Sequence, residues 1–132
     1  METMKQFVNK NKVRLSVEWA DENKNNPEWK DANHYKVTLK MGRRQLSTYF
    51  SQGYGIKGEP RAEDVLSALA SDSAGIENAR SFEDWAGDLG YDDTDSRKAE
   101  KVYKACERQA DKLKNFLGDD LYRTLLWQTE NL

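Results

Sequence analysis

The chain has 132 residues, a length typical of one domain, and its four Trp, six Tyr and four Phe can bury enough area for a hydrophobic core. Cys106 is the single cysteine, which excludes an intramolecular disulfide and so a cross-linked secreted scaffold. No apolar run approaches the ~20 residues that span a bilayer, and residues 1–12 lack the apolar stretch of a signal peptide, so we expect a cytoplasmic protein.

The charge is arranged in three blocks, although it sums to only −2. Residues 1–58 carry eleven Lys or Arg against six Asp or Glu, residues 59–95 carry two against eleven, and residues 96–132 carry eight against six. The net charges of the blocks are therefore +5, −9 and +2. Because an acidic block can cover a cationic surface of a partner and a basic block can bind polyanions, the pattern favours binding over catalysis.

The basic first block has the alternation of strands with one buried face. Apolar residues fall at every second position over three segments, 13–19, 35–41 and 46–50. Gly42 predicts a short turn between the second and third segments, and the third ends at the glycines that begin with Gly53. Residues 21–33, rich in Asn and Lys, predict an exposed hairpin loop in which Trp29 is unusual. We therefore expect a three-stranded antiparallel sheet.

After Pro60 the apolar spacing becomes three or four residues, as in helices. Ser81 with Asp84 is close to a capping box, and Gly90 and Gly118 are placed to end helices. The predicted helices cover about 60–72, 81–90, 95–118 and 119–130. Strands followed by helices indicate a single α+β domain over 1–132, in which about four helices cover one face of the sheet.

The glycine pattern of residues 53–58 fits G-x-G-x-x-G, which suggests a nucleotide-binding loop. Glu59, Glu63 and Asp64 crowd the following helix start, where they would repel a pyrophosphate, and no βαβ alternation follows. We therefore predict a strand-to-helix connection here and no cofactor.

Neither a metal site nor a catalytic group is predicted. The carboxylates Asp88, Asp92, Asp93 and Asp95 lack the spacing of an EF-hand, and they suit the cap of the following helix. His34 and Cys106 would have to meet from a hairpin and the apolar face of a helix, where a buried thiol is the expected role. We therefore expect a protein that is not an enzyme.

Two sets of cations are candidates for nucleic-acid binding. On the third predicted helix, cations spaced four, three and four apart form one stripe, Arg97, Lys101, Lys104 and Arg108, which Lys112 continues. On the outward face of the sheet, we expect Lys12, Arg14, Lys36 and Lys40 to gather near Arg43, Arg44 and Tyr49. Cations beside an exposed aromatic ring suit single-stranded nucleic acid. The alternatives are a salt-bridged helix face and a solubilising sheet face.

Residues 60–118, above all 63–72 and 82–100, resemble a family of small bacteriophage and prophage proteins. The resemblance brings no catalytic residues and implies a phage context, in the cytoplasm of a bacterial host. Phage proteins that disable host defences, among them anti-CRISPR proteins, are often compact, acidic and non-enzymatic.

Three functions follow from these observations. The first is a non-catalytic phage inhibitor of a host or defence complex that presents the carboxylates Glu63, Asp64, Asp88, Asp92, Asp93 and Asp95. The second is a nucleic-acid-binding accessory protein that uses the two sets of cations. The third is a virion or assembly component that self-associates through Trp29, Leu125, Leu126 and Trp127.

Overall fold

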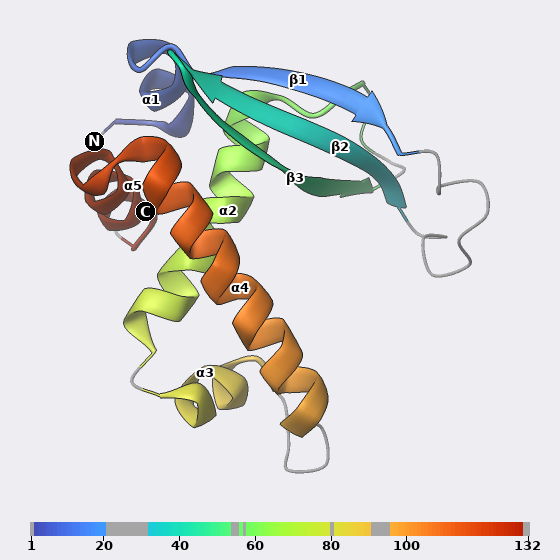
Figure 1. Cartoon of the computed structure of the whole chain (residues 1–132), viewed down its shortest axis with the longest axis vertical. Helices are drawn as coiled ribbons and strands as arrows, with labels where there is room; N and C mark the ends of the chain where they lie inside the picture. The colour runs from blue at the N-terminus through green and yellow to red at the C-terminus, as the bar shows by residue number, and fades with distance from the viewer. Residues whose placement is uncertain are drawn as a thin grey trace. The chain divides into compact units, whose positions relative to one another are not determined.

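A computed structural model describes residues 2–20, 32–53, 56, 58–79, 81–90 and 96–130. Within these ranges the elements are α1 (Met4–Lys10), β1 (Arg14–Trp19), β2 (Ala32–Met41), β3 (Arg44–Gly53), α2 (Ala62–Asn78), α3 (Phe82–Asp88), α4 (Ser96–Leu117) and α5 (Asp119–Glu130) (Figure 1). The predicted α+β class and antiparallel three-stranded sheet are confirmed. The chain forms two compact units, Glu2–Leu66 and Ser67–Leu132, and α2 runs across their boundary. The single domain expected over 1–132 stays a prediction.

The sheet has the order β1-β2-β3, so the central strand β2 is paired along both edges. Leu39 lies between Leu15 and Leu46 in the register, and Val37 lies beside Val17. Leu39 and Val37 are fully buried, as expected for the apolar side of a strand in which successive side chains point to opposite faces. The alternation in the sequence therefore describes the two faces of this sheet.

Strands β2 and β3 are longer than predicted. Asn33, expected in the hairpin loop, pairs with Gln52, and β3 begins at Arg44, before the predicted segment 46–50, and ends at Gly53, where its end was predicted. Backbone hydrogen bonds continue the ladder here without an apolar alternation, because pairing uses N–H and C=O groups that every such residue carries. Residues 21–31, with Trp29, lie outside the described residues.

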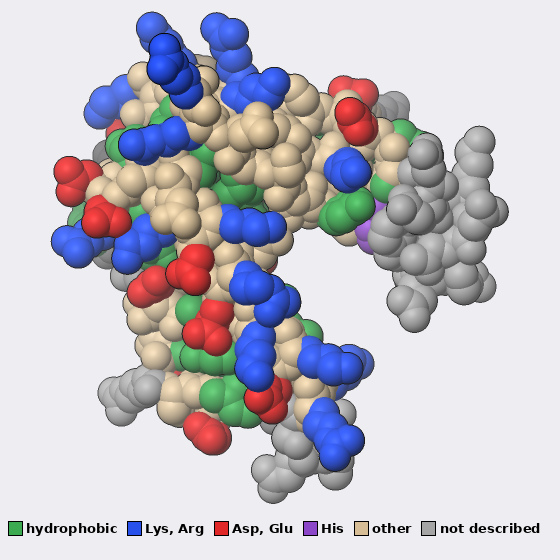
Figure 2. Space-filling view, in the orientation of Figure 1, with side chains coloured by type: hydrophobic (Ala, Val, Ile, Leu, Met, Phe, Trp, Pro, Cys, Tyr) green, Lys and Arg blue, Asp and Glu red, His purple; other side chains and the backbone are tan. Residues whose placement is uncertain are grey.

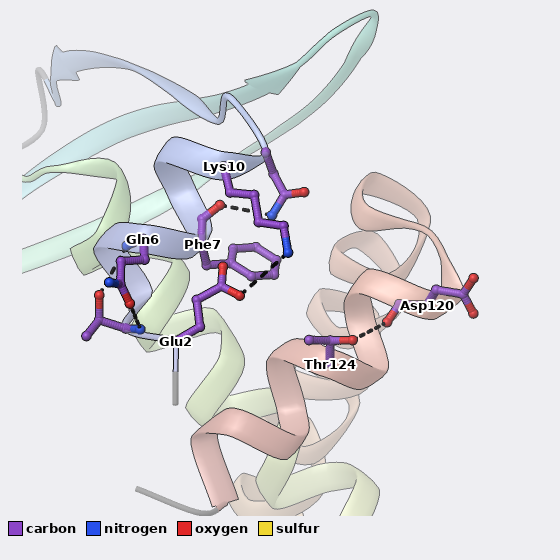
Figure 3. A network of polar contacts seen from close by, with 8 residues as sticks. Glu2, Gln6, Phe7, Lys10, Asp120 and Thr124 are labelled. Carbon is purple, nitrogen blue, oxygen red and sulfur yellow. Dashed lines mark hydrogen bonds and ion pairs between the residues drawn. The ribbon is translucent and has the colours of Figure 1, made fainter.

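Helix α1 was not predicted. Its start is a reciprocal capping box, in which the Thr3 N–H donates to Gln6 Oε1 at 2.8 Å and the Gln6 N–H donates to Thr3 Oγ1 at 3.1 Å (Figure 3). Phe7 is buried, and its carbonyl accepts a hydrogen bond from the Asn11 side chain at 2.9 Å. The exposed Lys10 ammonium lies 3.9 Å from the Glu2 carboxylate, a contact of small energetic value.

Helix α2 continues six residues beyond the predicted end at 72, to Asn78. Polar residues and Gly75 weaken the helical signal of this last part in the sequence. Ala74 is nonetheless buried, and Ile76 packs against the buried cluster of α3 and α4. Tertiary packing therefore keeps this turn and a half helical against its intrinsic propensity.

Helices α3 and α4 share an aromatic cluster. The Asp84 N–H donates to the N-cap hydroxyl of Ser81 at 3.1 Å, as the sequence pattern predicts. The Trp85 ring lies 5.1 Å from that of Tyr103 and 6.3 Å from that of Phe82, between ring centroids. Ala99 and Ala86 complete the buried part of the cluster.

Gly118 separates α4 from α5 with a φ of 84°, the left-handed conformation that favours glycine at a helix end. Its N–H donates to the Lys114 carbonyl at 2.8 Å. Leu113 and Leu125 are fully buried, and the Tyr122 hydroxyl donates to Glu77 of α2 at 3.0 Å. On the polar side of α5 the Thr124 hydroxyl donates to the Asp120 carbonyl at 2.9 Å (Figure 3).

Candidate nucleic-acid interface

The second face of the sheet is polar and open to solvent. Its side chains lie in rows that run across the strands, because residues opposite each other in the register share a face. From one end of the sheet to the other, the rows are Arg14–Lys40–Gln45, Ser16–Thr38–Ser47, Glu18–Lys36–Tyr49 and His34–Ser51. Thr38 and His34 are half-buried and the other members are exposed. We call these residues the polar sheet face.

Three cations stand on the polar sheet face. Arg14 lies directly opposite Lys40, and Lys36 lies four residues before Lys40 on the same strand, about 13 Å away at 3.3 Å per residue. The single carboxylate among the rows is Glu18, directly opposite Lys36. The face therefore has a net charge of +2 with its His neutral, and its cations lie in two rows with a hydroxyl row between them.

Hydroxyls and one aromatic ring supply the other chemistry of this face. The Thr38 and Ser47 hydroxyl oxygens are 2.9 Å apart, and Ser51 Oγ lies 2.8 Å from His34 Nδ1. Tyr49 is 55% exposed and lies opposite Lys36. These groups can donate to phosphate oxygens and stack on a base, respectively.

Three of the predicted cations are not members of the rows of the polar sheet face. Arg44 is opposite Met41, two residues before the buried Leu46, so the pleat places it on the apolar side of the strand. Lys12 lies in the turn before β1, with a φ of 53°, and Arg43 lies in the turn between β2 and β3. The prediction placed Lys12 on the outward face, whereas the structure has it in the turn; Arg43 and Arg44 were predicted only to lie near that face.

The predicted stripe on α4 is exposed along its length, at Arg97, Lys101, Lys104, Arg108 and Lys112. Figure 2 shows Lys and Arg side chains along this helix. The Lys104 ammonium lies 3.1 Å from the Glu100 carboxylate one turn earlier, an i,i+4 pair of about 0.3–0.5 kcal/mol. Acidic Glu107 and Asp111 are exposed on the same helix, so α4 carries charges of both signs.

Of the six carboxylates predicted to bind a partner, the structure describes the side chains of two, Glu63 and Asp64. Glu63 and Asp64 contact the guanidinium of Arg61 at 3.6 and 3.5 Å, at the start of α2. They belong to the first unit, whereas α3 belongs to the second. Of the other four carboxylates, Asp92, Asp93 and Asp95 lie outside the described residues, and Asp88 is described by its backbone alone.

The C-terminal residues predicted for self-association differ in exposure. Leu125 and Leu126 are buried, whereas Trp127 is 58% exposed. Helical periodicity turns consecutive residues to different sides, so the leucines pack inward and the tryptophan points outward. The prediction that both leucines supply self-association contacts is therefore wrong.

The lone histidine and cysteine lie in separate units. His34 contacts Ser51 in the sheet, and Cys106 of α4 packs against the aromatic cluster. Burial, with a smaller contribution from the Asp72 carboxylate, raises the pKa of the Cys106 thiol and so disfavours the reactive thiolate. Among the described residues, no three His, Cys, Asp or Glu side chains gather as metal ligands would.

No family model, curated protein or solved structure matches this chain. The resemblance to phage proteins stays a prediction. None of the helices in the described ranges combines the length and the apolar character that crossing a membrane requires.

Sequence reasoning missed the hydroxyl row and Glu18 of the polar sheet face. Their signal was present, because Ser16, Thr38 and Ser47 occupy the polar positions of the same alternations that placed the buried residues. Only the register shows that they form one row.

Proposed function

We propose that this chain is a nucleic-acid-binding accessory protein that contacts phosphates with its polar sheet face. The observation that carries the proposal is the placement of Arg14, Lys36 and Lys40 on one exposed face, with the ring of Tyr49 beside Lys36. Phosphate contacts by Lys and Arg supply most of the affinity of such proteins, because each contact releases condensed counterions.

The number of cations sets the expected salt dependence. Three phosphate contacts on a single strand correspond to a slope of about −2 for log K against log salt concentration. Affinity should then fall about 20-fold between 50 and 200 mM salt.

The test is fluorescence anisotropy with a labelled twelve-nucleotide oligothymidylate. Arg14→Glu with Lys40→Glu reverses the directly opposed pair, and should lower affinity more than about tenfold and flatten the salt slope by about 1.4. Arg97→Glu with Lys101→Glu on α4 is the matched control, since it changes the net charge equally at exposed positions. Loss of binding in the α4 variant alone would place the interface on the helix and overturn the proposal.

Inhibition of a host or defence complex by an acidic surface stays a separate prediction. Of its six carboxylates, the two with described side chains contact Arg61. A pull-down from infected-host lysate with and without nuclease separates the two functions. Recovery of a host complex that survives nuclease would favour inhibition, and capture that depends on nucleic acid would favour the polar sheet face.

A further inference from the structure

We infer that the ligand of the polar sheet face is a single strand whose backbone crosses the sheet along the hydroxyl row Ser16–Thr38–Ser47, with an unpaired base against Tyr49. The inference rests on the proposed nucleic-acid function and names the ligand's form and path. Its basis is the difference in side-chain length and chemistry between neighbouring rows in the register.

The hydroxyl row has short side chains, so it forms a low row between two rows of long side chains. Residues on the same face of a strand are about 6.6 Å apart, so the rows of Arg14 and of Lys36 lie at that distance on either side of Thr38. Serine and threonine end one atom beyond Cβ, whereas arginine, lysine and tyrosine extend several atoms farther. Across three strands the low row is about 10 Å long between the outer backbones.

The chemistry of the low row matches a phosphodiester backbone. A phosphate above Thr38 has cations on both sides, from Arg14 with Lys40 and from Lys36, at about one row's distance each. One of the two hydroxyls of Thr38 and Ser47 donates to the other at 2.9 Å, so the accepting hydroxyl keeps its own hydrogen for a ligand oxygen. Hydroxyl donors are common partners of phosphates.

Tyr49 supplies the preference for a single strand. The ring is more than half exposed and stands at the β3 end of the Lys36 row, next to the low row. A base can stack on an aromatic ring only when a face of that base is uncovered, and the bases of a duplex already cover each other. Removing such a ring lowers single-strand affinity by about tenfold.

The test compares the oligothymidylate with a twelve-base-pair duplex at 50 mM salt. The wild-type chain should bind the single strand at least tenfold more tightly, and Tyr49→Ser should remove most of this preference while Tyr49→Phe keeps it. Trp127→Ser, which removes an equally exposed ring from α5, is the matched control and should keep it as well. Thr38→Val with Ser47→Ala should lower affinity several-fold without changing the fit to a strand.

A cross-linking experiment tests whether the strand lies beside Tyr49. An oligonucleotide with 5-iodouracil, irradiated on the wild-type chain, should attach to the peptide that contains Tyr49. Attachment to α4, or equal affinity for single strand and duplex in wild type and Tyr49→Ser, would overturn the inference. If the wild-type chain binds the single strand and the duplex equally, and the Arg14→Glu with Lys40→Glu variant binds both more weakly, the proposed function stands and only the inferred ligand fails. If the wild-type chain binds neither probe, both fail.

Discussion

The aromatic cluster should determine whether α3 is folded, and Trp85→Ala tests this. Trp85 is only 5% exposed and contacts both Phe82 of its own helix and Tyr103 of α4. With seven residues, α3 is too short to be stable as an isolated helix. Its helical structure therefore depends on docking through this side chain.

The expected loss follows from the buried ring. Tryptophan-to-alanine changes in cores cost about 3–5 kcal/mol, through lost transfer energy and the cavity left behind. Because α3 can undock by itself, we expect the loss to appear first as local opening, with amide exchange in α3 about 100-fold faster, which corresponds to about 3 kcal/mol.

The assay is hydrogen exchange followed by mass spectrometry, with Leu89→Ala as the control. Leu89 caps the same helix and is 59% exposed, so its truncation should change exchange little. Peptides of β2 provide an internal reference in the first unit. If α3 of the Trp85→Ala variant exchanged no faster than that of Leu89→Ala, the cluster would not be what holds the helix.

Three further predictions concern charged and titratable groups. Burial and the hydrogen bond to Glu77 raise the pKa of Tyr122 to about 12, from 10 in the unfolded chain, so its contribution to stability is complete below pH 10 and is lost as the pH rises toward 12. Urea midpoints should fall less over this range for Tyr122→Phe than for the wild type; equal falls would contradict the assignment. Since burial raises the thiol pKa, Cys106 should react with a disulfide reagent at pH 8 more slowly in the folded chain than in urea, and equal rates would disprove this. Glu18→Gln removes the carboxylate opposite Lys36 and should increase oligothymidylate affinity about threefold at 50 mM salt, whereas weaker binding would argue against phosphates at this row.

Much of the fold could be predicted because its signals are local. The apolar stripe and Gly118 placed α4 and α5 within a residue of their observed bounds. The Ser81 N-cap likewise predicted where α3 begins. Helical and strand periodicities report which side of an element is buried, and they need no knowledge of what covers it.

Elements that depend on distant contacts were missed or cut short. Helix α1 has only Phe7 and Val8 as buried residues, too few for a periodic signal, although Thr3 and Gln6 carry its capping box. The last part of α2 is held by packing of Ile76 on the α3–α4 cluster, which outweighs the weak propensity of the segment.

The candidate interface, too, was predicted in part from local signals and decided in part by contacts between distant strands. The sequence by itself determined that Arg14, Lys36 and Lys40 alternate with buried residues and so point away from the core. Only the tertiary structure decided which of them are neighbours, and that Arg44 lies on the opposite side. The physical reason is that register is set by backbone hydrogen bonds between strands that are far apart in the chain, and a shift of one residue would turn every side chain to the other face.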